Sequence, residues 1–192
     1  MNAYQPPKYF AQGRVSLIAS ALGAGEVVAC PAEGVLGLSC DPFDQDAVLA
    51  LLQMKQRPVS KGLILVAAGI EPFMPVLESL TTVQRDTLLA SWPGPNTWLV
   101  PHCNYFPAWV TGSSDQVAIR VTSAPALQAL CSQFGGALVS TSANPAGRPP
   151  AHANWQLRRY FGRDLPSLPG GLDPVGKAST IRRVADGSVV RA

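Results

Sequence analysis

The alternation of helical and strand patterns along most of the chain is the feature that most constrains its fold. Apolar residues recur with helical spacing in the segments 15–22, 44–55, 124–134 and 155–161, and residues 71–91 are expected to hold two short helices. Short apolar runs predict strands over 27–30, 63–67, 98–101, 117–121 and 138–140, and a hairpin over 180–191 that turns at Asp186-Gly187. This alternation predicts an α/β domain.

We expect a single domain, residues 1–192 with a core of about residues 14–191, built around a twisted, open, mixed sheet. With 47% hydrophobic and 14% charged residues, a chain of 192 residues can bury a substantial core, which argues against disorder. No apolar run reaches the ~18–20 residues that span a bilayer, and residues 1–8 lack the apolar segment of a secretory signal. We therefore expect a cytoplasmic protein without a membrane partner.

The net charge of +3 is distributed unevenly along the chain. Residues 1–144 carry seven Lys and Arg against nine Asp and Glu, whereas residues 145–192 carry eight against three. The eight cations, which predict a basic face, are Arg148, Arg158, Arg159, Arg163, Lys177, Arg182, Arg183 and Arg191. Such a face suits RNA or a phosphate-bearing ligand, and an ordinary solvated surface explains it about as well.

Two patterns that could indicate a metal or nucleotide site lack the residues that such sites need. The four cysteines (Cys30, Cys40, Cys103 and Cys131) are widely spaced and form no Cys-x-x-Cys pair, so we expect free buried thiols rather than a zinc site. The segment 171–178, GLDPVGKA, nearly matches a phosphate-binding loop, but prolines precede it and alanine replaces the hydroxyl that would hold magnesium. It is rejected as a Walker loop.

Polar side chains are concentrated at the end of the predicted strand 138–140. Ser140, Thr141, Ser142 and Asn144 follow its apolar residues, and a proline and a glycine then turn the chain. In an open α/β sheet, ligands bind beyond the carboxyl ends of the strands. This cluster therefore predicts a ligand site.

Three cations lie within seven residues where a predicted helix meets a buried strand. They are Lys55, Arg57 and Lys61. Cations favour the dipole at a helix C-terminus, and the proline that follows Arg57 would stop the helix, so a structural role is one interpretation. The other is a phosphate clamp in a concave basic site.

Arg120 is unusual because it lies within an apolar strand pattern. A buried arginine needs a partner for its charge. A carboxylate or phosphate of a ligand could be that partner, and so could Glu33 or Asp115 of the chain itself.

Six segments, in this order, resemble the YrdC/TsaC family, the threonylcarbamoyl-AMP synthases of tRNA modification. The family pattern is P-T-E-x-V-Y-G-L, K-x-R-P, W-P-G-P-x-T, V-x-x-R-x, S-x-S-A-N-x-x-G and S-T-I. The chain has PAEGVLGL (31–38), KQRP (55–58), WPGPNT (92–97), VAIRV (117–121), STSANPAG (140–147) and STI (179–181). Taken alone, 92–97 and 179–180 are ordinary turn sequences. The resemblance covers about residues 14–191 and implies a YrdC-like fold.

The resemblance implies a nucleotidyltransferase, an L-threonylcarbamoyladenylate synthase. Such an enzyme condenses L-threonine, bicarbonate or CO2, and ATP to threonylcarbamoyl-AMP and pyrophosphate. The threonylcarbamoyl group then passes through downstream transferase proteins to adenosine 37 of tRNAs that read ANN codons, giving threonylcarbamoyladenosine (t6A). Mg2+ is expected to arrive with ATP and not to be held by protein side chains, and a direct tRNA contact is expected.

The motifs also imply roles for individual residues. Lys55 and Arg57 are the expected catalytic residues, because they would neutralise charge on the reacting phosphates. The residues expected to hold ATP are Lys55, Arg57, Lys61, Ser142, Asn144 and Arg191. The residues expected to hold threonine are Arg120, Ser140, Ser179 and Thr180.

The chain departs from the family pattern at several positions. Ala32 and Gly34 stand where relatives often carry threonine, and Leu36 replaces an aromatic residue. Val66 lies where longer relatives have a histidine that contacts the substrate. The missing hydroxyls are expected to affect threonine affinity more than reaction type. Since the sequence ends at Ala192, the short bacterial form is the one it resembles.

Two alternatives predict different chemistry. A non-catalytic RNA-binding protein of the same fold would bind RNA in a salt-dependent manner and would not turn over ATP. A paralogue making another carbamoyl-adenylate would not require threonine.

Overall fold

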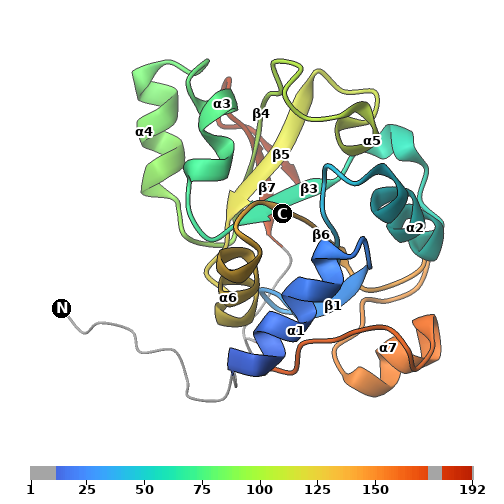
Figure 1. The fold of residues 1–192 in the computed structure, drawn as a ribbon. Helices are drawn as coiled ribbons and strands as arrows, with labels where there is room; N and C mark the ends of the chain where they lie inside the picture. The colour runs from blue at the N-terminus through green and yellow to red at the C-terminus, as the bar shows by residue number, and fades with distance from the viewer. Residues whose placement is uncertain (1–11, 173–178, 192) are drawn as a thin grey trace.

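The short apolar runs pair into one mixed sheet at the centre of the molecule (Figure 1). The structure is a computed structural model that describes residues 12–172 and 179–191. Within these residues the sheet has eight strands in the order β1-β2-β6-β3-β5-β4-β7-β8. Their bounds are β1 (Val28–Pro31), β2 (Leu36–Ser39), β3 (Ile64–Ala67), β4 (Asn96–Pro101), β5 (Gln116–Val121), β6 (Leu138–Ser142), β7 (Thr180–Arg183) and β8 (Val189–Arg191).

Both parallel and antiparallel pairs occur, as the sequence predicts. β3 pairs in parallel with β5 and antiparallel with β6, so that Ile64 lies beside Ala118 on one side and beside Ser140 on the other. β4 is antiparallel to β5 and parallel to β7, which brings the predicted C-terminal hairpin onto the sheet. The register therefore places residues from distant parts of the chain in adjacent rows.

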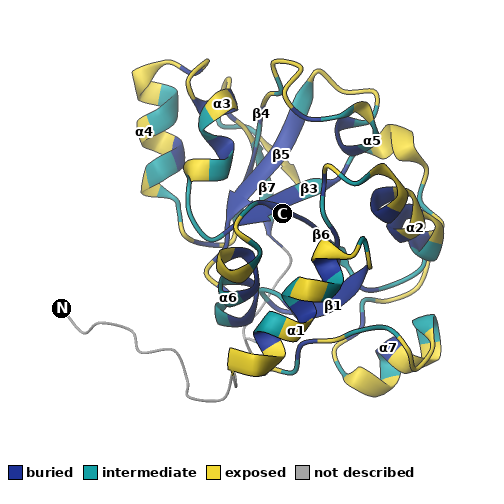
Figure 2. Ribbon diagram, in the orientation of Figure 1, coloured by how far each residue is buried: buried dark blue, intermediate teal, exposed yellow. Residues whose placement is uncertain are grey.

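Helices cover both faces of the sheet, and the strands are largely buried except β7 and β8 at one edge (Figure 2). Alternate residues of a strand point to opposite faces. In β3, Leu65 and Ala67 belong to the core under α2 (Gln45–Lys55), α3 (Met74–Leu77) and α4 (Thr82–Ala90), whereas Val66 packs in a second core with α1 (Gln12–Gly23) and α6 (Pro125–Phe134). The remaining helical segments are η1 (Val59–Lys61), η2 (Glu71–Phe73), α5 (Ala108–Thr111) and α7 (Asn154–Phe161).

The helix starts follow the capping residues of the sequence. Asp44 accepts a hydrogen bond from the Ala47 amide at 3.0 Å and caps α2, and Thr81 caps α4 in a reciprocal pair with Gln84. The start of α2 agrees with the predicted helix 44–55, and α4 lies within the segment 71–91 that was expected to hold two short helices. In the part of the chain that the structure describes, no helix combines the length and apolar character needed to cross a membrane.

Strand β2 is the main element that the sequence prediction missed. The sequence predicts no strand in the glycine-bearing segment 31–38, but Leu36–Ser39 pairs with both β1 and β6. Because β2 supplies a partner, β6 continues to Ser142 instead of ending at Ser140, with Leu38 beside Thr141. The polar cluster therefore occupies the last residues of a strand and does not lie wholly beyond it.

The described cations of the predicted basic face belong to segments that contact different parts of the sheet. Arg182, Arg183 and Arg191 belong to β7 and β8 at one edge of the sheet. The segment carrying Arg148, Arg158, Arg159 and Arg163 contacts β1 and β2 at the opposite edge, through hydrogen bonds such as Leu36 N to Ala151 O at 2.8 Å. Residues 1–8, and positions 173–178 of the segment 171–178 that nearly matches a phosphate-binding loop, Lys177 among them, lie outside the described residues.

The expectation of buried thiols is confirmed at three positions and wrong at the fourth. Cys30, Cys40 and Cys131 are free and buried. Cys103 is free but exposed, because it lies in the loop after β4 rather than in an element of the core.

Candidate functional site

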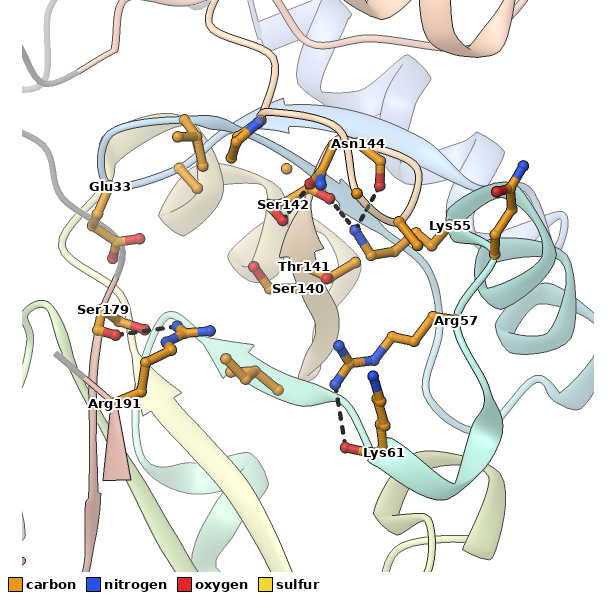
Figure 3. Close-up of a pocket in the computed structure, with 18 of the residues that line it drawn as sticks. Glu33, Lys55, Arg57, Lys61, Ser140, Thr141, Ser142, Asn144, Ser179 and Arg191 are labelled. Carbon is orange, nitrogen blue, oxygen red and sulfur yellow. Dashed lines mark hydrogen bonds between the residues drawn. The ribbon is translucent and has the colours of Figure 1, made fainter. Parts of the chain in front are cut away.

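A cavity of about 520 Å³ lies over the sheet, with most of the predicted site residues in its walls (Figure 3). Its floor includes Ile64 of β3, Arg120 of β5 and Ser140 of β6, which share the sheet face that α1 and α6 cover elsewhere. The predicted residues that line it are Lys55, Arg57, Lys61, Arg120, Ser140, Ser142, Asn144, Ser179 and Arg191. Figure 3 shows Lys55, Arg57 and Lys61 on one side and Glu33, Ser179 and Arg191 on the other.

Lys55 ends α2 and joins it to the end of β6. Its Nζ donates hydrogen bonds to the carbonyl of Ser142 and, at 3.1 Å, to that of Asn144. Burial, with a smaller contribution from the nearby Arg57 cation, lowers the pKa of Lys55 from 10.5 to about 8. The residue is only 5% exposed, so the fold holds a partly desolvated ammonium group at the cavity wall.

Arg57 stabilises the loop that follows α2. Its Nη2 donates to the carbonyls of Lys61 at 3.2 Å and Gly62 at 2.8 Å, and its Nε also donates to Gly62 at 3.3 Å. Burial and then the Arg191 charge lower its pKa. The helix end itself is closed by the left-handed Gln56, whose amide donates to α2 carbonyls. Lys55 and Arg57 therefore serve the cavity wall and not the cap of their own helix.

Ser142 and Asn144 fix each other. The Ser142 hydroxyl donates to Asn144 Oδ1 at 2.6 Å, and Asn144 Nδ2 donates to the carbonyl of Arg148 at 2.7 Å. The asparagine side chain thus closes the turn after β6. Both residues line the cavity next to Lys55, so this corner presents an ordered polar surface.

Arg120 forms an ion pair with Glu33, one of the two chain partners that the sequence allows; Asp115 is not the one it uses. The other carboxylate oxygen of Glu33 accepts hydrogen bonds from the Thr122 hydroxyl and, at 3.3 Å, from the Ser123 amide. Arg120 is 4% exposed and lines the cavity together with Glu33. A charged group is therefore held at the floor with its orientation already fixed.

Ser179 and Arg191 come from the start and end of the C-terminal hairpin. Arg191 Nη2 donates to the Ser179 carbonyl at 3.2 Å. Burial and then the Arg120 charge lower the pKa of Arg191, while Arg191 in turn lowers that of Arg57. Arg191 is therefore close enough to interact electrostatically with both Arg57 and Arg120. Thr180 pairs with Asn96 in the sheet and is not among the described residues that line the cavity.

Thr97 is a residue that the sequence interpretation missed. The segment 92–97 was expected to be a turn packing an indole, and Trp92 Nε1 does donate to the Asn96 carbonyl at 2.7 Å. However, Asn96 and Thr97 already belong to β4, and the Thr97 hydroxyl donates to Ser179 Oγ at 2.9 Å. The sequence signal that could have identified Thr97 is its position directly before the apolar run 98–100, which places it in the strand.

The cavity is strongly cationic. Its described lining carries five cations, Lys55, Arg57, Lys61, Arg120 and Arg191, and one carboxylate, Glu33. Serine hydroxyls from β6 and from residue 179 lie between them. Clustered cations in a concave, partly desolvated site attract anionic ligands and strengthen their binding. The arrangement suits a ligand that carries several negative charges.

The sequence matches a known family along most of its length. The model of the Sua5/YciO/YrdC family, described as "Telomere recombination", matches residues 20–192. A protein of Cellvibrio japonicus named threonylcarbamoyl-AMP synthase is 48% identical over 181 residues, covering 93% of this chain and 95% of the relative. A protein of the same name from Pseudomonas aeruginosa PAO1 is 49% identical over 179 residues, covering 93% and 96%.

Solved structures share the fold. Pyrococcus abyssi Sua5 complexed with L-threonine superposes with a TM-score of 0.83 at 26% identity, covering 93% of this chain and 53% of the other. The chain therefore spans about half the length of that protein. Escherichia coli YciO superposes with a TM-score of 0.80 at 20% identity, covering 94% of this chain and 89% of the other, and shows the α/β fold alone.

Proposed function

The chain belongs to the Sua5/YciO/YrdC family, and from this premise we infer that it is an L-threonylcarbamoyladenylate synthase, a nucleotidyltransferase. Its relatives named threonylcarbamoyl-AMP synthase match almost their whole length to this chain. In the proposed reaction the threonine amine combines with bicarbonate to give a carbamate and water. A carbamate oxygen then attacks the α-phosphorus of ATP, and pyrophosphate leaves.

The observation that carries this proposal is the division of one cavity between two kinds of wall. Lys55, Arg57 and Lys61 form a cationic side, which suits a triphosphate. Arg120, together with the serines of β6 and residue 179, forms a side suited to a small carboxylate ligand. Pyrococcus abyssi Sua5 is solved in complex with L-threonine, which supports threonine as a ligand, and we assign it to this side because Arg120 suits its carboxylate.

Catalysis is proposed to depend on positioning and charge neutralisation. Phosphoryl transfer of this kind needs charge stabilisation at the phosphates more than a covalent nucleophile. Lys55 and Arg57 would offset the charge that develops on the phosphates, with Ser142 and Asn144 beside them to orient the nucleotide. Ser140, on the floor between the two sides, would contact threonine or its carbamate.

Mg2+ is proposed to enter with ATP. Among the described residues no cluster of three or more His, Cys, Asp or Glu side chains could hold a metal ion. The Glu33 carboxylate in the cavity lining is already paired with Arg120. The donor set thus fits an ion coordinated by phosphate oxygens and water, and neutralising phosphate charge is the chemistry that it would supply.

Pyrophosphate release with each substrate omitted in turn tests the proposal. The purified chain should release pyrophosphate only when ATP, L-threonine and bicarbonate are all present. Lys55→Met should abolish the signal, which excludes a contaminating ATPase, while Arg14→Met, a loss of charge on the exposed face of α1, should preserve it. Release without threonine would contradict the proposal.

The product is proposed to serve t6A formation on tRNA in the cytoplasm, through downstream transferase proteins. Arg158, Arg159 and Arg163 are exposed on and after α7, which makes this segment the proposed tRNA contact. Salt-dependent RNA binding without pyrophosphate release would instead favour the non-catalytic alternative.

A further inference from the structure

We propose that Thr97 is a positioning residue that fixes the Ser179 hydroxyl as a hydrogen-bond donor to an anionic oxygen of the amino-acid substrate. This inference rests on the proposed function, because it assigns Ser179 to the threonine side of the cavity. Thr97 does not line the cavity itself among the described residues, and it is 0% exposed. Its effect on the substrate must therefore pass through another side chain.

The hydroxyl of Thr97 reaches Ser179 across 82 residues of sequence. Thr97 Oγ1 lies 2.9 Å from Ser179 Oγ and donates to it. A buried hydroxyl proton needs an acceptor, and among the described residues Ser179 Oγ is the acceptor that Thr97 uses. Ser179 is buried as well, but it lines the cavity and can direct its own proton there, whereas Thr97 does not line it, so the hydrogen bond runs from Thr97 to Ser179.

The direction determines what Ser179 can offer to a ligand. A serine hydroxyl has one proton and two lone pairs. With a lone pair engaged by Thr97, the Ser179 proton is left to point into the cavity that Ser179 lines. A donor in this position selects an acceptor on the substrate, such as a carboxylate or carbamate oxygen, over an ammonium group.

The backbone around Ser179 is fixed by the same part of the molecule. The Thr180 amide donates to the Pro95 carbonyl at 2.9 Å, and the Ser179 carbonyl accepts from Arg191. Rotation of the hydroxyl is the freedom that remains, and the Thr97 hydrogen bond removes it. Thr97 thus acts on the orientation of a neighbouring group and does not contact the reacting atoms.

Thr97→Val tests this role, because it replaces the hydroxyl with a methyl group of similar shape. Pyrophosphate release is measured with threonine varied at saturating ATP and bicarbonate, and then with ATP varied. We expect the KM for threonine to rise about fivefold, as for the loss of one oriented hydrogen bond, with kcat and the KM for ATP within about twofold of the original values. Thr97→Ser keeps the donor, so its KM for threonine should stay close to that of the unaltered protein.

A double-mutant cycle identifies the residue through which Thr97 acts. Thr97→Val should have no further effect on the threonine KM in a Ser179→Ala background, since the hydroxyl it orients is gone. Thr111→Val is the matched control: Thr111 is a buried threonine on α5 whose hydroxyl donates to the Pro107 carbonyl, and its loss should leave the threonine KM unchanged.

Several outcomes would overturn the inference. They are additive effects of Thr97→Val and Ser179→Ala, an equal loss in Thr97→Ser and Thr97→Val, or a threonine KM that Thr97→Val leaves unchanged. A fall in kcat with equal rises in both KM values would also overturn it, because that pattern indicates a general packing defect. If the unaltered protein releases no pyrophosphate, the proposed function fails as well; if it does and Thr97→Val matches it, this inference alone fails.

Discussion

Raising the pH from about 7 to about 9 is expected to weaken ATP binding about tenfold, because it removes a proton from Lys55. Burial and the nearby Arg57 lower the pKa of Lys55 to about 8, so the side chain is about 90% charged at pH 7 and about 10% charged at pH 9. If the triphosphate binds only the charged form, the apparent affinity falls in proportion to that population.

Loss of the same proton is expected to increase the stability of the fold while it weakens ATP binding. Between pH 8 and 10.5 the unfolded chain still holds the Lys55 proton, whereas the folded chain has lost it. Stability rises with pH wherever the unfolded state binds more protons, so this residue contributes an increase across that window. The difference between 10.5 and about 8 corresponds to about 3 kcal/mol, which the charged form costs the fold at neutral pH.

Two measurements on the same samples test this pair of effects. Calorimetric titration with ATP and Mg2+ gives the ATP affinity at each pH. Threonine and bicarbonate are left out, so that their own ionisation does not contribute to the pH dependence. Urea unfolding gives the stability. Lys55→Met should flatten the pH dependence of binding, and the difference in stability between Lys55→Met and the unaltered chain isolates the contribution of this one group.

Lys61→Met is the control for a simple loss of charge. Lys61 is an exposed cation at the edge of the same cavity, so its removal should lower ATP affinity at every pH and leave the slope unchanged. The reasoning is refuted if the unaltered protein binds ATP equally well at pH 7 and 9, or if Lys55→Met retains the original slope.

Three further predictions follow from other parts of the structure. Arg120→Met should raise the KM for threonine at least about tenfold and leave that for ATP within about twofold, and it should cost about 3 kcal/mol of stability in urea unfolding by leaving Glu33 buried without its partner. Adding Glu33→Gln should restore stability but not the KM, and equal effects on both substrates would count against the assignment. Gly112→Ala should destabilise the fold by at least about 2 kcal/mol, because φ is +67° and a Cβ would lie 2.6 Å from backbone atoms of the neighbouring loop. Gly135→Ala, with open space around it, should cost about 1 kcal/mol in urea unfolding. Similar losses of stability in the two variants would contradict this. Cys131 should lower stability above about pH 9, opposite in sign to Lys55, because burial raises its pKa to about 12 and the thiol ionises first in the unfolded chain. Relative to the unaltered protein, Cys131→Ala should therefore gain stability in urea unfolding as the pH rises above about 9, and a difference that does not change with pH would argue against it.

Local chemistry made the helices predictable. The side chains of Asp44 and Thr81 each satisfy a backbone amide three residues away, so the signal and the structure it specifies lie in the same few residues. Strand β2 lacked such a signal: Leu36–Ser39 is short and contains a glycine, and its pairing depends on β6, about a hundred residues further along. Sequence periodicity cannot report a partner that distant.

The same distinction holds for the candidate site. Lys55, Arg57 and the β6 serines were found because each belongs to a compact motif, and Arg120 because a charge interrupts an apolar strand. What the motifs could not supply is how their members connect. The sequence left open whether Arg120 pairs with Glu33, and it gave Thr97 no role beyond a turn, because both contacts join segments 80 or more residues apart.

The position of β8 at the outer edge of the sheet couples the pairing of this strand to ligand binding in the cavity. Its three residues are exposed and pair with β7 alone, yet β8 carries Arg191 and so forms part of a wall of the cavity. Edge segments with few buried contacts open locally at a fraction of the free energy of global unfolding. Detachment of β8 would withdraw Arg191, so a bound ligand that contacts Arg191 and a paired β8 each raise the population of the other, and the amide protons of β8 would report ligand occupancy.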